Sequence, residues 1–134
     1  MEELYINHFA VITAAVSMFV LGGLWYGPLF GKQWMSANDF SEEDLKNGSP
    51  AKQYGLGLIF SIIMAYNLAA FLGDAGTDAA WGATAGFLAG FGWVFFGVAM
   101  ISMFEQRSWK YIFVNGGYMT AAFTIMGLII GAWR

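Results

Sequence analysis

The chain has 134 residues, of which 58% are hydrophobic and only 11% are charged. Soluble domains carry about 25% charged residues, and a domain of this size could not cover so much apolar surface with polar groups. These values argue against a soluble fold and favour a protein whose solvent is the lipid bilayer. The net charge of −3 argues against a nucleic-acid partner, because phosphate backbones require a basic patch. The lack of cysteine excludes disulfides and thiolate metal sites.

Four long apolar segments are predicted to cross the membrane as helices. Each holds the roughly 20 residues needed to span about 30 Å of hydrocarbon, and a soluble four-helix bundle would instead show a polar face on each helix. The segments are residues 6–26, 54–72, 79–104 and 109–133. We therefore expect an all-α, integral membrane four-transmembrane-helix bundle, with one transmembrane domain over residues 1–134. The first helix is expected to be retained, because Glu2 and Glu3 replace the basic start of a signal peptide.

The end of the first segment is predicted to be a membrane exit. Pro28 is expected to stop the helix, and Lys32 to mark the cytoplasmic side. Aromatic rings favour the level of the lipid headgroups, so the rings here are expected to anchor the exit at the interface. The predicted anchor consists of Trp25, Tyr26, Gly27, Pro28, Gly31, Lys32 and Trp34.

Residues 27–53 are expected to form a cytoplasmic connection that contains one short helix. Ser41 is a good N-cap, and the acidic residues 42–44 suit the positive end of a helix. Phe40 and Leu45 have the spacing of a hydrophobic staple. Cation binding by the same acidic residues is the alternative interpretation, and capping explains them with fewer assumptions.

Small residues recur at steps of three or four in the later segments, a pattern that lets membrane helices approach closely. The predicted helix-packing residues are Gly57, Ser61, Gly82, Gly86, Gly90, Gly116, Gly127 and Gly131. Because a four-helix monomer of this size has a limited interior, some of these contacts are expected to join protomers. The pattern therefore predicts a homo-oligomer.

The distribution of basic residues predicts the orientation in the membrane. Of the six Lys and Arg residues, five lie in the connections after the first and third segments, and Arg134 alone lies on the other side. By the positive-inside rule, these two connections face the cytoplasm, and both termini face the periplasm.

Few polar side chains inside the segments are candidates for chemistry. His8, the single histidine, could bind haem or a metal, but an interfacial histidine that bonds a backbone group or a lipid headgroup is the favoured interpretation. Asn67 and Asn115 could coordinate a solute or form interhelical hydrogen bonds. Glu105 could pair with Lys110 or Lys32. No catalytic residue, metal site or cofactor is predicted.

Two parts of the chain carry a family resemblance. The first is Leu-Gly-Gly-Leu-Trp-Tyr-Gly-Pro-Leu-Phe-Gly-Lys-Gln-Trp at residues 21–34. The second comprises residues 104–109, 115–118, Gly127 and residues 131–133. Together they resemble a bacterial family known only as domain of unknown function 1761. The resemblance implies a small four-span membrane protein, and it supplies no activity or catalytic residues. We expect the chain to lie in the bacterial inner membrane.

The sequence thus favours a non-catalytic, oligomeric helical bundle that acts through packing or partner contact. A small-solute channel or carrier is the alternative, with a path lined by Asn67, Asn115, Tyr118 and Thr120. An enzyme or haem protein that uses His8 is the third hypothesis. The lipid bilayer and a second copy of the chain are the expected partners.

Overall fold

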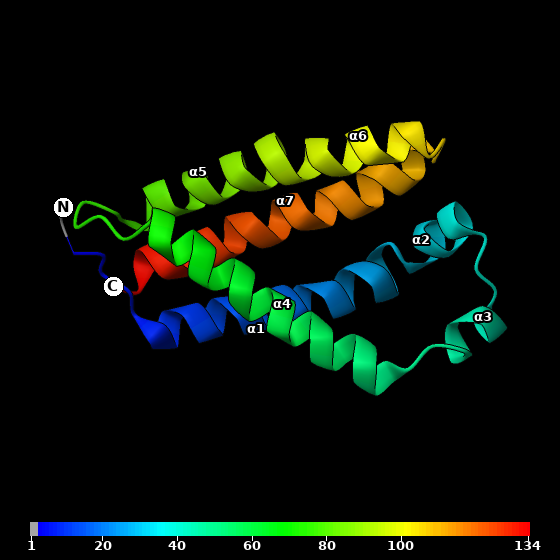
Figure 1. The fold of residues 1–134 in the computed structure, drawn as a ribbon, viewed down its shortest axis with the longest axis horizontal. Helices are drawn as coiled ribbons and strands as arrows, with labels where there is room; N and C mark the ends of the chain where they lie inside the picture. The colour runs from blue at the N-terminus through cyan, green and yellow to red at the C-terminus, as the bar shows by residue number, and fades with distance from the viewer. Residues whose placement is uncertain (1–2) are drawn as a thin grey trace.

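A computed structural model describes residues 3–134 of the chain, so Glu2 lies outside the described part (Figure 1). All regular elements within residues 3–134 are helical. They are α1 (His8–Leu24), η1 (Trp25–Leu29), α2 (Gly31–Asn38), α3 (Glu42–Lys46), α4 (Pro50–Phe71), α5 (Ala79–Ala89), η2 (Gly90–Phe95), α6 (Phe96–Phe104) and α7 (Trp109–Ala132). The two segments labelled η have the wide turn of a π-helix.

Four helices are long and apolar enough to cross a membrane, which confirms the predicted fold class. They cover His8–Leu29, Pro50–Phe71, Ala79–Phe104 and Trp109–Ala132. The second span begins at Pro50, earlier than the predicted residue 54. The reason is local, because the Ser49 hydroxyl accepts a hydrogen bond from the Lys52 amide, and proline suits the first position of a helix.

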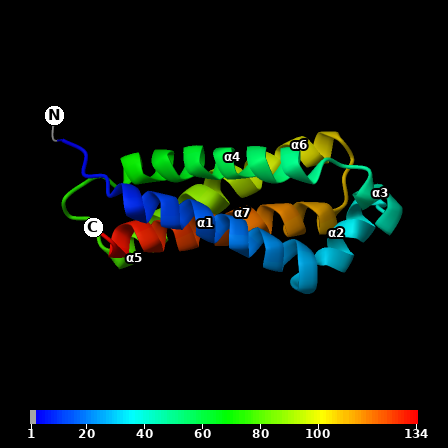
Figure 2. The same cartoon turned by 90° about the horizontal axis from the view of Figure 1, so that it is seen from below.

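The spans run up and down, so the connections gather at two ends of an elongated bundle (Figures 1 and 2). One end, here called the terminal end, holds both chain termini and the turn between α4 and α5. The opposite end holds α2, α3 and the turn between α6 and α7. We call it the basic end because its connections and the first turns of α4 and α7 contain Lys32, Lys46, Lys52, Arg107 and Lys110.

Pro28 does not stop the first helix, contrary to the prediction. The helix continues through Pro28 as the π-turn η1 and ends at Leu29, where the Phe30 amide donates to the Trp25 carbonyl at 2.7 Å. Proline lacks an N–H and crowds the preceding turn, and a π-turn accommodates such a break in the regular ladder. The chain then turns at Phe30 into α2, and a Cβ atom at Gly31, the first residue of α2, would lie 2.8 Å from the Tyr26 carbonyl oxygen.

The connection after the first span contains a helix that the sequence analysis missed. α2 packs against α7 and ends at Asp39, whose φ of 54° lies in the left-handed region. Its start has no side-chain cap, so the usual sequence signal for a helix is missing there. The predicted short helix is present as α3, with Ser41 and Asp44 forming a capping box.

The core lies where α1, α4 and α7 meet. It is built from small and flexible apolar residues, including Ala14, Met18, Ala65, Ala122 and Met126. α5 joins this group mainly through α7, and the two backbones come into direct contact at several glycines. The Gly82 and Gly86 positions of α5 lie against Gly127 and Phe123 of α7, where an added Cβ would overlap backbone atoms. These glycine ladders therefore pack within one chain, so they do not support the predicted contact between protomers.

Candidate functional site

The two parts of the sequence that carry the family resemblance meet at the basic end of the bundle. Trp25 donates its indole N–H to the Val114 carbonyl at 2.8 Å. Tyr26 donates its hydroxyl hydrogen to Oδ1 of Asn115 at 2.7 Å. Both donors belong to η1 and both acceptors to α7, 89 residues away in the chain. The π-turn thus places consecutive aromatic residues so that each reaches α7.

The residues of the predicted membrane exit make contacts within the protein. Trp25, Tyr26 and Trp34, which were expected to anchor the exit among the lipid headgroups, are half-buried, and the ring centroids of Tyr26 and Trp34 lie 5.5 Å apart. The polar atoms of Trp25 and Tyr26 bond to α7 because a buried N–H or O–H group needs a protein partner. Lys32 is exposed.

Tyr118 completes the group from α7. Its hydroxyl donates to the Met18 carbonyl at 2.8 Å, which links α7 to α1. Its ring lies 5.3 Å from that of Tyr26 at an interplanar angle of 69°. A Cβ atom at Gly22 would lie 3.1 Å from the Tyr118 oxygen, so the glycine makes room for this close approach.

These side chains border a cavity of about 440 Å³, which we call the aromatic pocket. It is lined by Phe19, Gly22, Gly23, Tyr26, Gly27, Trp34, Tyr54 and Tyr118. The pocket is therefore formed by α1, η1, α2, α4 and α7 together. Sequence analysis named Tyr26, Trp34 and Tyr118 but missed Phe19 as a member. The Phe19 ring of α1 contacts the Tyr54 ring of α4. The two residues are far apart in the sequence, so no sequence pattern predicts this contact.

The electrostatic character of the aromatic pocket follows from its lining. No charged side chain lines it within residues 3–134. The hydroxyl hydrogens of Tyr26 and Tyr118 are already committed to Asn115 and to the Met18 carbonyl. These two residues therefore offer the pocket oxygen lone pairs and ring faces, both of which carry negative potential.

The residues proposed for a polar path do not converge on one cavity. Tyr118 lines the aromatic pocket, whereas Asn67 lines a cavity of about 200 Å³ beside Trp93 and Phe71. Thr120 lines a third cavity, of about 570 Å³. Asn115 lines none of these three cavities in the described part of the chain. The four residues are therefore distributed around the bundle.

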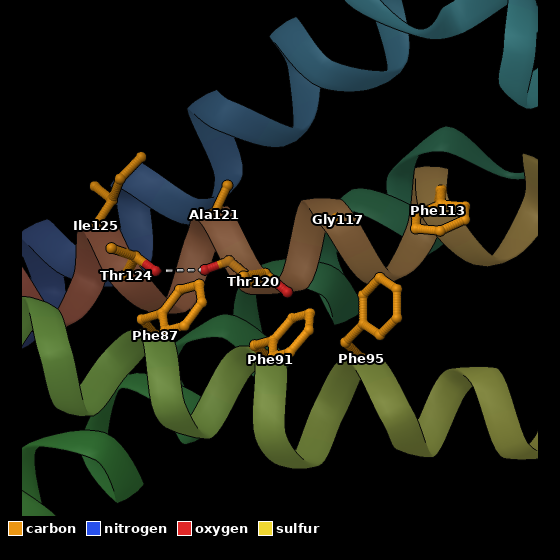
Figure 3. Close-up of a pocket in the computed structure, with 9 residues that line it drawn as sticks. All are labelled: Phe87, Phe91, Phe95, Phe113, Gly117, Thr120, Ala121, Thr124 and Ile125. Carbon is orange, nitrogen blue, oxygen red and sulfur yellow. Dashed lines mark hydrogen bonds between the residues drawn. The ribbon is translucent and has the colours of Figure 1, made fainter.

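The third cavity is an apolar groove between the third and fourth spans (Figure 3). Phe87, Phe91 and Phe95 form one side of it, and the α7 side includes Thr120 and Thr124. Both hydroxyls donate to carbonyls one turn earlier in α7, Thr120 to Gly116 and Thr124 to Thr120. The groove therefore offers a ligand mainly apolar surface.

The other polar candidates have partners inside the chain. His8 is exposed, and its Nδ1 lies 2.8 Å from the Tyr66 hydroxyl. Glu105 pairs with Arg107 at 3.5 Å, so the predicted pairing with Lys110 or Lys32 is wrong. Lys110 instead donates to the Ser36 hydroxyl at 3.2 Å and thereby ties α7 to α2. The prediction failed because α2, which supplies this partner, was not foreseen.

Comparison with known proteins gives one family. A search of curated proteins and a search of solved structures returned no match. The family described as "Protein of unknown function (DUF1761)" matches residues 9–131, nearly the whole chain and both of the stretches that meet at the aromatic pocket. The chain therefore belongs to the DUF1761 family of proteins of unknown function.

Proposed function

We propose that this protein is a non-catalytic helical bundle of the bacterial inner membrane that acts through contact with other membrane helices, first with a second copy of itself. The observation that carries the proposal is the position of Asn67. This residue lies inside the second span, and its side chain is exposed at the cavity that it shares with Trp93 of η2.

The hydrogen bonds of Asn67 are incomplete within one chain. Its amide nitrogen donates to the Ile63 carbonyl of the same helix at 2.9 Å. Its side-chain oxygen accepts no hydrogen bond from residues 3–134. Hydrocarbon offers no donor, so an amide in a membrane helix favours association with another helix, at about 0.6–1.7 kcal/mol for each hydrogen bond.

A second copy is the partner that this amide fits best. A carboxamide contains both a donor and an acceptor, so two Asn67 side chains related by a two-fold axis can bond to each other in both directions. Trp93, which is 68% exposed, lines the same cavity as Asn67 and would add apolar area to that contact. The proposed interface therefore comprises α4 and η2.

Disulfide cross-linking tests this interface directly, because the native chain has no cysteine. We expect Asn67→Cys to form a cross-linked dimer on mild oxidation in membranes. Thr13→Cys, on the exposed part of α1, is the matched control and should stay monomeric. Equal cross-linking at both positions would contradict the proposal.

A second measurement tests the amide group of Asn67 by substitution, without cysteine. We expect Asn67→Leu to shift the protein toward the monomer in mild detergent, while Asn67→Gln keeps the amide and the oligomer. Thr13→Val removes another exposed polar group and should leave the mass unchanged. The proposal would be overturned if the wild-type protein is monomeric by light scattering and the Asn67→Cys variant does not cross-link.

A further inference from the structure

The aromatic pocket has the size and the walls of a small-molecule site. Its volume of about 440 Å³ lies within the range of roughly 300–1,000 Å³ that is usual for ligand pockets. Five aromatic rings line it, from Phe19, Tyr26, Trp34, Tyr54 and Tyr118. This property is separate from the proposed contact face, because Asn67 and Trp93 do not line the pocket.

The rings that line the pocket pack edge to face in pairs. Tyr26 lies at 69° to Tyr118 and at 72° to Trp34, and their centroids are 5.3 Å and 5.5 Å from that of Tyr26. The Phe19 and Tyr54 rings meet at 63°. In an edge-to-face pair the neighbour covers only one ring face, so the other faces remain to line such a space. The face of each ring carries the negative part of its quadrupole, so such a space attracts positive charge.

The hydrogen-bond donors and acceptors that line the pocket determine which kind of cation fits it. The hydroxyls of Tyr26 and Tyr118 donate to protein acceptors, and no carboxylate lines the pocket within the described residues. A primary ammonium group has three N–H donors, and without a carboxylate it would exchange its hydrogen bonds to water for weaker ones to phenolic oxygens. A quaternary ammonium group has no N–H and binds through ring faces alone. We propose that the aromatic pocket binds a quaternary ammonium group by cation–π contact.

Two sources could supply this group, because the pocket lies at the end of the bundle. One is the headgroup of a choline lipid, and the other is a free quaternary amine. Both present the same trimethylammonium chemistry to the rings, so the experiment must separate them.

The central test compares choline with its uncharged isostere, 3,3-dimethylbutan-1-ol, on the full chain in dodecyl maltoside. Ligand-observed NMR measures both affinities. We expect choline to bind saturably and at least about tenfold more tightly than the alcohol, because cation–π contact of about 1.4 kcal/mol requires the charge. Equal affinities would overturn the proposal, since they would mean a hydrophobic cavity only.

Substitutions locate the site. Tyr54 is 65% exposed, so Tyr54→Leu is expected to fold, and it should weaken choline binding by about threefold. Trp34→Leu removes a half-buried ring and should weaken binding by about tenfold. Trp109→Leu is the matched control, because this tryptophan is 62% exposed and lies outside the pocket. Unchanged affinity in the Tyr54 variant, or equal losses in all three, would overturn the proposal.

Nanodiscs identify the source of the cation. If the natural occupant is a lipid headgroup, added choline should bind in nanodiscs of phosphatidylethanolamine and phosphatidylglycerol but not in those of phosphatidylcholine. If binding is equal in both, the pocket selects a free amine; each result supports a cation site. Asn67→Leu should bind choline as the native chain does, so a failed oligomer test and a failed cation test remain distinguishable.

Discussion

Gly82 and Gly127 set the distance between α5 and α7. At each position an added Cβ would overlap the carbonyl group of the other glycine, so the two backbones touch directly. Such contacts replace the apolar driving force that helices lack in lipid. The hydrogen bonds from Trp25 and Tyr26 to α7 act in the same way at the basic end, where close packing alone would leave polar atoms unpaired.

This packing leaves no room at Gly127 even for one added methyl group. We expect Gly127→Ala to lower the free energy of unfolding by about 1–3 kcal/mol or more. The new methyl group would meet backbone atoms of Gly82 and Gly86, which cannot move aside as a side chain can. Gly97→Ala is the matched control, since no atom lies within 4 Å of the new methyl group, and helices favour alanine over glycine. Thermal unfolding in detergent measures the difference. Equal effects of the two changes would show that α5 and α7 do not touch at Gly127.

At the scale of elements, the short helix α3 depends on its capping box. The pKa of Asp44 is lowered, because hydrogen bonds with Ser41, first its backbone amide and then its hydroxyl, stabilise the ionised carboxylate. Ser41 donates its amide hydrogen to the carboxylate at 2.8 Å. The ionised carboxylate is therefore the form that the helix favours.

The sign of this shift predicts how α3 responds to pH. A lowered pKa in the folded state means that the stabilisation is complete above the unfolded value of about 3.9 and is lost as the pH falls through the folded value. We expect the Cα chemical shifts of Glu42–Lys46 to move toward random-coil values over that acidic range. Asp44→Asn should remove this dependence, whereas Asp39→Asn should retain it. A transition that persists in the Asp44 variant would assign it to another group.

The spans could be predicted well from sequence, and the elements between them could not. Apolar length alone indicates a membrane helix, because hydrocarbon permits few other structures. The start of α3 could be predicted equally well, because Ser41 and Asp44 lie only three positions apart in the sequence. α2 and the π-turns carry no comparable local signal, because they depend on contacts with α7. The aromatic pocket was only partly foreseen for the same reason: its walls come from five elements that meet only in three dimensions.

At the scale of the whole molecule, charge is distributed unevenly between the two ends. The connections at the basic end, together with the first turns of α4 and α7, contain five of the six Lys and Arg residues. The sixth, Arg134, donates to the Leu72 and Asp74 carbonyls at 2.6 Å and lies 5.1 Å from the centre of the Tyr5 ring. Arg134 therefore ties the C-terminus to the end of α4, and it is one basic residue opposite the five at the basic end.

This asymmetry predicts that the basic end faces the cytoplasm and both termini the periplasm. A periplasm-active reporter fused after Arg134 should be active, and the same reporter inserted between Gln106 and Arg107 should be inactive. A cytoplasm-active reporter at the two positions serves as the control and should give the reverse pattern. Activity of the cytoplasmic reporter after Arg134 would contradict the proposed orientation.

The first part of α4 gives the aromatic pocket an unusual boundary. Residues 50–56 are exposed, and in Figure 1 α4 diverges from α5 and α6 toward the basic end. Tyr54 is the residue that α4 contributes to the pocket, whereas the other walls belong to α1, η1, α2 and α7. In kinetic terms, we expect the exposed first part of α4, with Tyr54, to be the wall that moves first. We expect a ligand to enter and leave sideways, between α1 and α4, at a rate that the tilt of α4 controls.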